Sequence, residues 1–152
     1  MKESLIQDIH KIRTILKSFK KSDFHSGTNF YSCLNGFPAG CCGDTTNLLG
    51  LFIIKMYDKR CIYISATGLG KNKDLSHAWL SCDDYIIDIT ADQFNSIGYN
   101  LKPVIISKVS VFHAQFIKTK LYELNVDKLK YTPVYSVFER VILEMQQDER
   151  NI

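Results

Sequence analysis

The sequence predicts an α+β fold, with helices near both ends of the chain and an antiparallel β-sheet between them. Apolar residues recur at intervals of three and four near both termini, which is the spacing of one helix face. Short segments of β-branched and aromatic residues fill the second half of the chain, as expected for strands. The length of 152 residues is that of one ordinary domain. We therefore expect residues 1–152 to form a single domain.

The first predicted element is an amphipathic helix. Its polar face carries lysine and arginine, and its apolar stripe consists of Leu5, Ile6, Ile9, Ile12, Ile15, Leu16 and Phe19. Much of the excess positive charge, within a net charge of +3, lies on this helix and in the Lys17–Lys21 segment, without an aromatic-laced stripe. We interpret this charge as a solvated face, so nucleic acid is not the expected partner. Binding of nucleic acid through the first helix remains a minor alternative.

A long loop and a buried helix follow. Residues 22–39 are rich in Ser, Gly, Asn and aromatic residues, which is typical of a loop, and the segment is long enough to be functional. A helix should begin near Cys41 or Cys42, where Asp44 and the two threonines after it can satisfy free backbone N–H groups. Its apolar content predicts a buried helix, through Leu48, Leu49, Phe52, Ile53 and Met56.

The second half of the chain should supply most of the sheet and a closing helix. The predicted strands are Ile62–Thr67, Ser76–Ser81, Tyr85–Thr90, Val104–Ser107 and Val109–Phe116. The Gly68–Lys73 loop separates the first two, and the Cys82-Asp83-Asp84 turn joins the next two into a hairpin. Thr132-Pro133 marks the start of the last helix, and the polar tail after Gln146 is expected to fray. The apolar stripe of this helix is Val134, Val137, Phe138, Val141, Ile142 and Met145.

Composition and cysteine usage favour a cytoplasmic protein without membrane partners. The chain is 45% hydrophobic and 23% charged, which is typical of a globular protein, and its first residues lack the apolar core of a signal peptide. The longest apolar run, Leu48–Ile54, is too short to span a bilayer. Five cysteines, an odd number, fit a reducing compartment. Because the chain has no Cys-x-x-Cys pair and no paired histidine spacing, we expect no metal and no other cofactor.

The segment Gly40-Cys41-Cys42-Gly43 opens the predicted buried helix and carries the first candidate for chemistry. A thiol is a useful nucleophile as the thiolate, which a helix N-terminus or a cationic neighbour favours. We predict Cys42 as the nucleophile. Two alternatives stay open on these residues alone: Cys41 is the reactive thiol, or both cysteines are small buried apolar residues.

The hairpin downstream supplies a histidine and a carboxylate on one face. A Cys82-Asp83 turn would set His77 opposite Asp88, and an Asp83-Asp84 turn would set Asp88 diagonal to it, so the two share a face either way. Trp79 lies on the same face. A carboxylate among isoleucines needs a partner, which an imidazole N–H supplies. A purely structural histidine–aspartate pair is the alternative interpretation.

Together these motifs resemble the transglutaminase-like branch of the papain-like cysteine enzymes. Gly40–Thr46 is similar to the family segment in which Gly-x-Cys is followed by glycine, an acidic and a small residue, and this favours Cys42 over Cys41. His77-Ala78-Trp79 and Asp88-Ile89-Thr90 resemble the His-Ala-Trp and Asp-x-Thr strands, in the same order. The resemblance covers residues 37 to about 94, and the rest of the chain carries no family signature.

The resemblance implies a papain-like core, in which the nucleophile helix packs on an antiparallel sheet. It also implies acyl transfer at an amide: Cys42 attacks the carbonyl carbon, His77 accepts the thiol proton, and Asp88 fixes the imidazole. The expected activity is that of a cysteine hydrolase, a peptidase (thiol protease) or glutamine deamidase acting on a protein or peptide. The alternatives are a transglutaminase or acyltransferase with an amine acceptor, and an inactive protein-binding module of the same fold.

The second donor for the oxyanion is left open by the sequence. The backbone N–H of Cys42 is one expected donor. The papain pattern would supply a glutamine, but none occurs between Gln7 and Cys42. Asparagine in a loop is ordinarily explained by turn formation, and Gln93 could cap a turn instead. The candidates for the second donor or for the lining of the cleft are Asn29, Tyr31, Asn35, Trp79 and Gln93.

Overall fold

The computed structural model describes all residues from Met1 to Ile152 and has the predicted α+β arrangement. The α-helices are α1 (Glu3–Ser18), α2 (Asn29–Ser32), α3 (Cys42–Tyr57), α4 (Val126–Leu129) and α5 (Pro133–Arg150). Short 3₁₀ helices are η1 (Lys21–Asp23), η2 (Ala91–Ile97) and η3 (His113–Gln115). The strands are β1 (Ile62–Leu69), β2 (Leu75–Cys82), β3 (Tyr85–Asp88), β4 (Ile105–Ser107) and β5 (Lys118–Glu123). None of the helices is long and apolar enough to cross a membrane.

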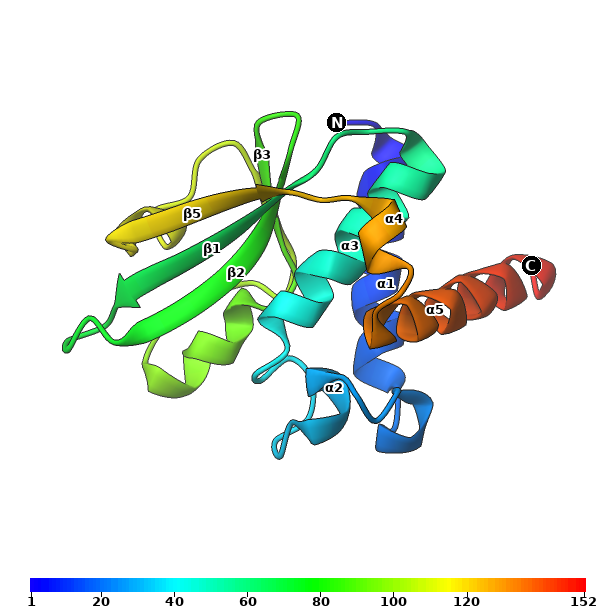
Figure 1. Cartoon of the computed structure of the whole chain (residues 1–152), viewed down its shortest axis with the longest axis horizontal. Helices are drawn as coiled ribbons and strands as arrows, with labels where there is room; N and C mark the ends of the chain where they lie inside the picture. Colours follow the sequence, from blue (N-terminus) through cyan, green and yellow to red (C-terminus); the bar gives the residue numbers. More distant parts are fainter.

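Helix α3 is the central element of the helical layer. It contacts β2 on one side and α1 and α5 on the other, so it lies between the sheet and the terminal helices (Figure 1). This position explains why its apolar residues are not confined to one stripe: Leu48, Leu51 and Ile53 are all fully buried. The terminal helices bury one face each, as their three- and four-residue apolar spacing predicts.

The five strands form an antiparallel sheet in the order β4-β3-β2-β1-β5. In the β2–β3 hairpin Cys82 pairs with Tyr85, so the two-residue turn is Asp83-Asp84, and both of its residues have positive φ, at 50° and 64°. Two positive φ angles are what a tight hairpin turn of the favoured hand requires. Of the two registers that the sequence allowed, the structure therefore has the one that places Asp88 diagonal to His77.

The two faces of the sheet contribute to two apolar clusters. Leu80 and Ile87 belong to the larger cluster, which they share with α1, α3 and α5. The opposite face carries a smaller aromatic cluster, which consists of Ala66, Leu69, Trp79, Ala91, Phe94, Phe112 and Phe116 and which we call the site-side cluster. The side chain of His77 lies on the same face of the sheet as that of Trp79, as its position two residues away in the strand predicts. The ring centroid of His77 lies 5.1 Å from that of Phe94 and 6.1 Å from that of Phe116.

One predicted strand is wrong. Residues Val109–Phe116 form a turn followed by η3, and the side chains of Val109 and Val111 are largely exposed. The Ser110 hydroxyl accepts the backbone N–H of His113 at 3.3 Å, which favours a tight turn over an extended segment. The strand that pairs with β1 is instead Lys118–Glu123. A strand must pair with the open edge of another strand, and the outer edge of β1 is already paired with β5.

Two smaller expectations are also corrected. Helix α5 continues to Arg150, beyond the point where we expected fraying after Gln146. The segment 22–39 contains η1 and α2 as well as loop. Each of these two short helices is capped at its N-terminus by a local side-chain contact. Asp23 accepts the N–H of Lys20 at 2.8 Å, and Thr28 accepts the N–H of Tyr31 at 3.3 Å.

Candidate active site

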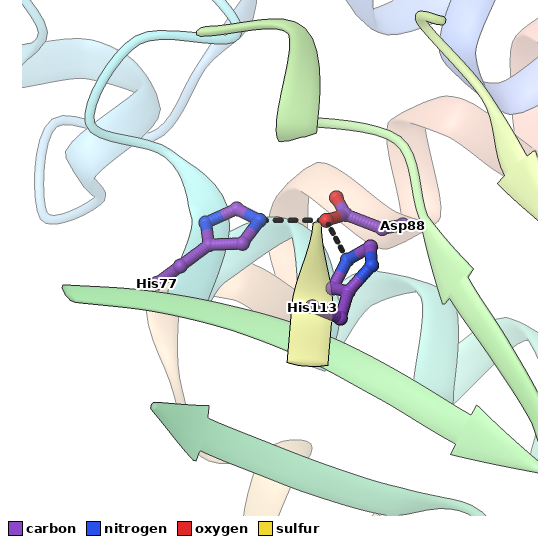
Figure 2. Close-up of side chains that lie close together, drawn as sticks. All are labelled: His77, Asp88 and His113. Carbon is purple, nitrogen blue, oxygen red and sulfur yellow. Dashed lines mark hydrogen bonds and ion pairs between the residues drawn. The ribbon is translucent and has the colours of Figure 1, made fainter. Parts of the chain in front are cut away.

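Asp88, at the end of β3, is the centre of a buried hydrogen-bond network. Its Oδ1 atom accepts the backbone N–H of Thr90 at 2.8 Å and the Thr90 hydroxyl at 3.2 Å. Its Oδ2 atom lies 2.6 Å from Nε2 of His77 and 2.8 Å from Nε2 of His113 (Figure 2). Burial raises the pKa of Asp88, but the two imidazoles outweigh burial and hold this pKa well below its usual range. Asp88 is therefore a carboxylate at neutral pH.

His77 is held by β2 with its side chain fully buried. Burial lowers the pKa of His77, but the charge of Asp88 and the neighbouring Cys42 sulfur outweigh it and raise the pKa to about 9. The ring is therefore positively charged at neutral pH. Because Asp88 occupies Nε2, the nitrogen available for proton transfer is Nδ1, on the opposite side of the ring (Figure 2).

Cys42 is the first residue of α3 and is partly exposed. Its sulfur lies close enough to the His77 ring to raise the pKa of that ring. Cys41, by contrast, is fully buried, and burial together with Cys33 raises the pKa of its thiol far above the usual value. The Cys41 thiol donates to the carbonyl of Ala39 at 3.3 Å. The geometry thus favours Cys42 over Cys41 as the thiol that works with His77.

Gln93, a cleft candidate from the sequence, lies beside the Nδ1 atom of His77. Its amide nitrogen is 3.4 Å from His77 Nδ1 and donates to the carbonyl of Thr90 at 3.0 Å. Its amide oxygen accepts the N–H of Gly40 at 3.3 Å. Gln93 therefore connects the segment that precedes Cys42 with the segment that follows Asp88.

The η2 helix that carries Gln93 is anchored by a contact that the sequence analysis missed. Arg13 of α1 forms two bonds to the Asp92 carboxylate, at 2.7 and 2.9 Å, and also donates to the carbonyl of Ile89. The Arg13 side chain is about 10% exposed, and its guanidinium lies over the ring of Phe37. A buried, bidentate arginine–carboxylate pair fixes orientation as well as charge. It ties the first helix to the turn next to Asp88.

Trp79, the other candidate on the sheet, is buried against the histidines. Its ring centroid lies 4.5 Å from that of His113 and 5.9 Å from that of His77. The indole N–H is buried without a hydrogen-bond partner. Trp79 is therefore a wall of the site-side cluster and supplies an unused buried donor.

The side chains of the three loop candidates have no hydrogen bond to the candidate site residues. The Asn29 backbone N–H donates to Asp44 at 2.6 Å, the Tyr31 ring lies 4.5 Å from the Lys21 ammonium, and Asn35 is exposed in a turn. None of their side chains forms a hydrogen bond with Cys42, His77 or Asp88. The expectation that Asp44 satisfies an N–H group of its own helix is wrong: its carboxylate accepts the N–H of Asn29, at the start of α2.

His77, Asp88 and His113 are the residues that could hold a metal ion, since their ligand atoms lie within 4.8 Å of one another. A metal would need these atoms around a common centre, at about 2.0 to 2.2 Å from it. Instead, both Nε2 atoms point at the same oxygen, Asp88 Oδ2, at hydrogen-bond distances (Figure 2). The arrangement fits two hydrogen bonds to a carboxylate better than three ligands of a metal.

His113 is the main residue that the sequence analysis did not place. Its ring comes from η3, more than twenty residues after Asp88, and no motif joins the two. The only local signal is Ser110, three residues before it, whose hydroxyl lies 2.6 Å from His113 Nδ1.

Comparison of the chain with family models, curated proteins and solved structures found no match. The site itself combines a thiol at a helix N-terminus, a charged imidazole and a buried carboxylate on an α+β scaffold.

Proposed function

We propose that this chain is a cysteine-dependent amide hydrolase with a papain-like, transglutaminase-like core, in which Cys42, His77 and Asp88 form a catalytic triad. The observation that carries the proposal is the 2.6 Å contact between Asp88 Oδ2 and His77 Nε2 in a fully buried pair, with Cys42 next to the same ring. A carboxylate bound to Nε2 leaves Nδ1 free to accept the thiol proton. In such a triad the carboxylate orients the imidazole, and the imidazole acts as base for the nucleophile.

In the proposed reaction the Cys42 thiol proton resides on His77 Nδ1, and the sulfur attacks the carbonyl carbon of an amide. The backbone N–H of Cys42, at the start of α3, would donate to the resulting oxyanion. The C–N bond then breaks as His77 gives its proton to the leaving nitrogen, and a thioester with Cys42 remains. Water attacks the thioester, with His77 as the base, and releases a carboxylic acid and the free thiol.

The proposed substrate is a protein or peptide, cleaved at its backbone or deamidated at glutamine. A transglutaminase or acyltransferase would resolve the same thioester with an amine, and the triad serves both outcomes equally. A binding module of the same fold that has lost activity is the remaining rival. It gives no reason for a charged His77 beside a helix-terminal thiol, which supports the enzyme proposal.

The test is hydrolysis of a peptide library that includes glutamine-containing peptides, with ammonia and new N-termini both measured. Replacement of the nucleophile, Cys42→Ser, should lower the rate by about a thousandfold or more. The matched control is Cys41→Ser, which changes the neighbouring buried thiol and should keep the activity. Addition of a primary amine distinguishes hydrolase from transferase by the product. Activity that survives Cys42→Ser would refute the triad.

A further inference from the structure

A second imidazole shares the carboxylate oxygen that His77 uses. The Nε2 atom of His113 lies 2.8 Å from Asp88 Oδ2, and the side chain of His113 is about 2% exposed (Figure 2). Together with the two bonds from Thr90, this contact brings the hydrogen bonds that Asp88 accepts to four. Four is about the full acceptor capacity of a carboxylate. The buried charge of Asp88 is thus completely satisfied, and His113 supplies one quarter of these bonds.

The protons in this network follow from which atoms are able to donate. Asp88 is ionised and has no proton to give, so His77 and His113 must each present an Nε2–H group to it. On the other side of His113, the Ser110 oxygen accepts the backbone N–H of His113 at 3.3 Å and lies 2.6 Å from Nδ1. The Ser110 hydroxyl proton is therefore free to point at Nδ1, which then acts as an acceptor. A ring with Nε2 protonated and Nδ1 accepting is neutral.

We propose that His113 is a positioning residue of the Cys42 site: its neutral Nε2–H tautomer, set by Ser110, donates to Asp88 and fixes the carboxylate where it holds His77. This inference rests on the proposed function of Cys42 and His77. A neutral His113 adds a donor without adding a second cation, so the single negative charge of Asp88 remains matched to His77. Ser110, His113, Asp88 and His77 then form a continuous chain of hydrogen bonds that ends at the His77 ring, which Cys42 neighbours.

A purely structural role for His113 would depend on packing alone. Its ring lies edge-on to Trp79, at 4.5 Å, and to Phe112, at 5.0 Å, so an apolar side chain of similar size would satisfy the site-side cluster. Donor and packing can therefore be separated by two substitutions of similar bulk. His113→Leu keeps apolar contact and removes the donor, whereas His113→Gln places an amide N–H near the former position of Nε2–H.

The first measurement is the tautomer of His113 in ¹⁵N-labelled full-length protein, by long-range ¹H–¹⁵N NMR at pH 7. We expect a protonated Nε2 and an unprotonated Nδ1. A protonated Nδ1, or a ring protonated at both nitrogens, would overturn the inference. Disappearance of the Nε2–H signals of both His77 and His113 on addition of one equivalent of Zn²⁺ would overturn it in favour of a metal site.

The second measurement is the rate of Cys42 alkylation by iodoacetamide at pH 6. His113→Leu should lower this rate by about tenfold, because a carboxylate displaced by a fraction of an ångström orients His77 poorly. His113→Gln should restore most of it. Equal rates in the two variants would contradict a positioning role. If His113→Leu does not fold, Ser110→Ala serves in its place, and a rate and tautomer unchanged from wild type would overturn the proposal.

A wrong role for Cys42 and a wrong role for His113 would give different results in these variants. Failure of the proposed function would appear in His77→Ala, whose Cys42 would then react as fast as in wild type. Failure of the His113 inference alone would appear as a slow His77→Ala variant together with equal rates for His113→Leu and His113→Gln.

Discussion

At the scale of single residues, the site depends on an ion pair inside the protein. Burial opposes charge on both His77 and Asp88, yet their contact keeps both charged. Four protein donors surround the Asp88 carboxylate and stabilise its buried charge. A buried pair of this kind is costly to break from one side, since removal of one partner leaves the other charge uncompensated.

Asp88→Asn should lower the pKa of His77 from about 9 toward its ordinary value. The asparagine removes the charge that favours the imidazolium, while burial, which lowers the pKa, remains. Titration of the His77 Cε1–H resonance by NMR measures this change. Asp92→Asn, which alters the nearby Arg13 pair, is the matched control and should leave His77 charged near neutral pH. An unchanged titration of His77 in Asp88→Asn would contradict the ion pair.

At the scale of elements, the Asp44 carboxylate contributes to the cap of the short helix α2 in the loop before Cys42. The Asp44 side chain, in the first turn of α3, accepts the backbone N–H of Asn29 at 2.6 Å. Asp44→Ala should lower the free energy of unfolding by about 1 kcal/mol, because that N–H loses its acceptor. Asp44→Asn keeps an acceptor and should lose less. Chemical denaturation measures both, and equal losses in the two variants would argue against capping.

The packing of α3 on the sheet gives a second prediction at this scale. Leu80 is fully buried on the face of β2 that α3 covers, and a methyl group added at Gly50 of α3 would lie 3.5 Å from it. Leu80→Ala should therefore lower the free energy of unfolding by about 2 to 5 kcal/mol. Leu121 of edge strand β5 is 67% exposed, so Leu121→Ala is the matched control, with an effect of about 0.5 kcal/mol or less. Similar losses for both would show that α3 and β2 do not pack as described.

At the scale of the whole molecule, stability should depend on the charge of His77. The folded-state pKa of about 9 lies above the ordinary 6.5, so the stabilisation is complete below about pH 6.5 and is lost as the pH rises through about 9. Burial also raises the pKa of the Cys41 thiol, which destabilises the fold at alkaline pH as well. The measurement is therefore a difference: unfolding free energies at pH 6 and pH 9, in wild type and in His77→Gln. The variant should lose less stability between the two, and an equal loss would contradict a charged His77.

Much of the fold and of the candidate site was predictable, because local sequence patterns determine it. Three- and four-residue spacing predicted α1 and α5, first-turn residues and apolar content predicted α3, and the two-residue period of the hairpin placed His77, Trp79 and Asp88 on one face. What local patterns do not carry is the pairing of distant segments. His113 contacts Asp88 because a turn at Ser110 brings its ring back over the sheet. In the sequence, the alternation of residues 109–116 is typical of a strand, and only the Ser110 hydroxyl indicates a turn. The edge strand β5 was missed because all its side chains are exposed.

Activation of Cys42 by His77 can be measured at the thiol itself. Mass-spectrometric mapping of iodoacetamide labelling at pH 6 compares the five cysteines of the wild type with those of His77→Ala. We predict fast labelling that is concentrated on Cys42 and that collapses in the variant, while Cys41 stays unmodified in both. Uniform slow labelling, or labelling of Cys42 that is indifferent to His77, would contradict the account.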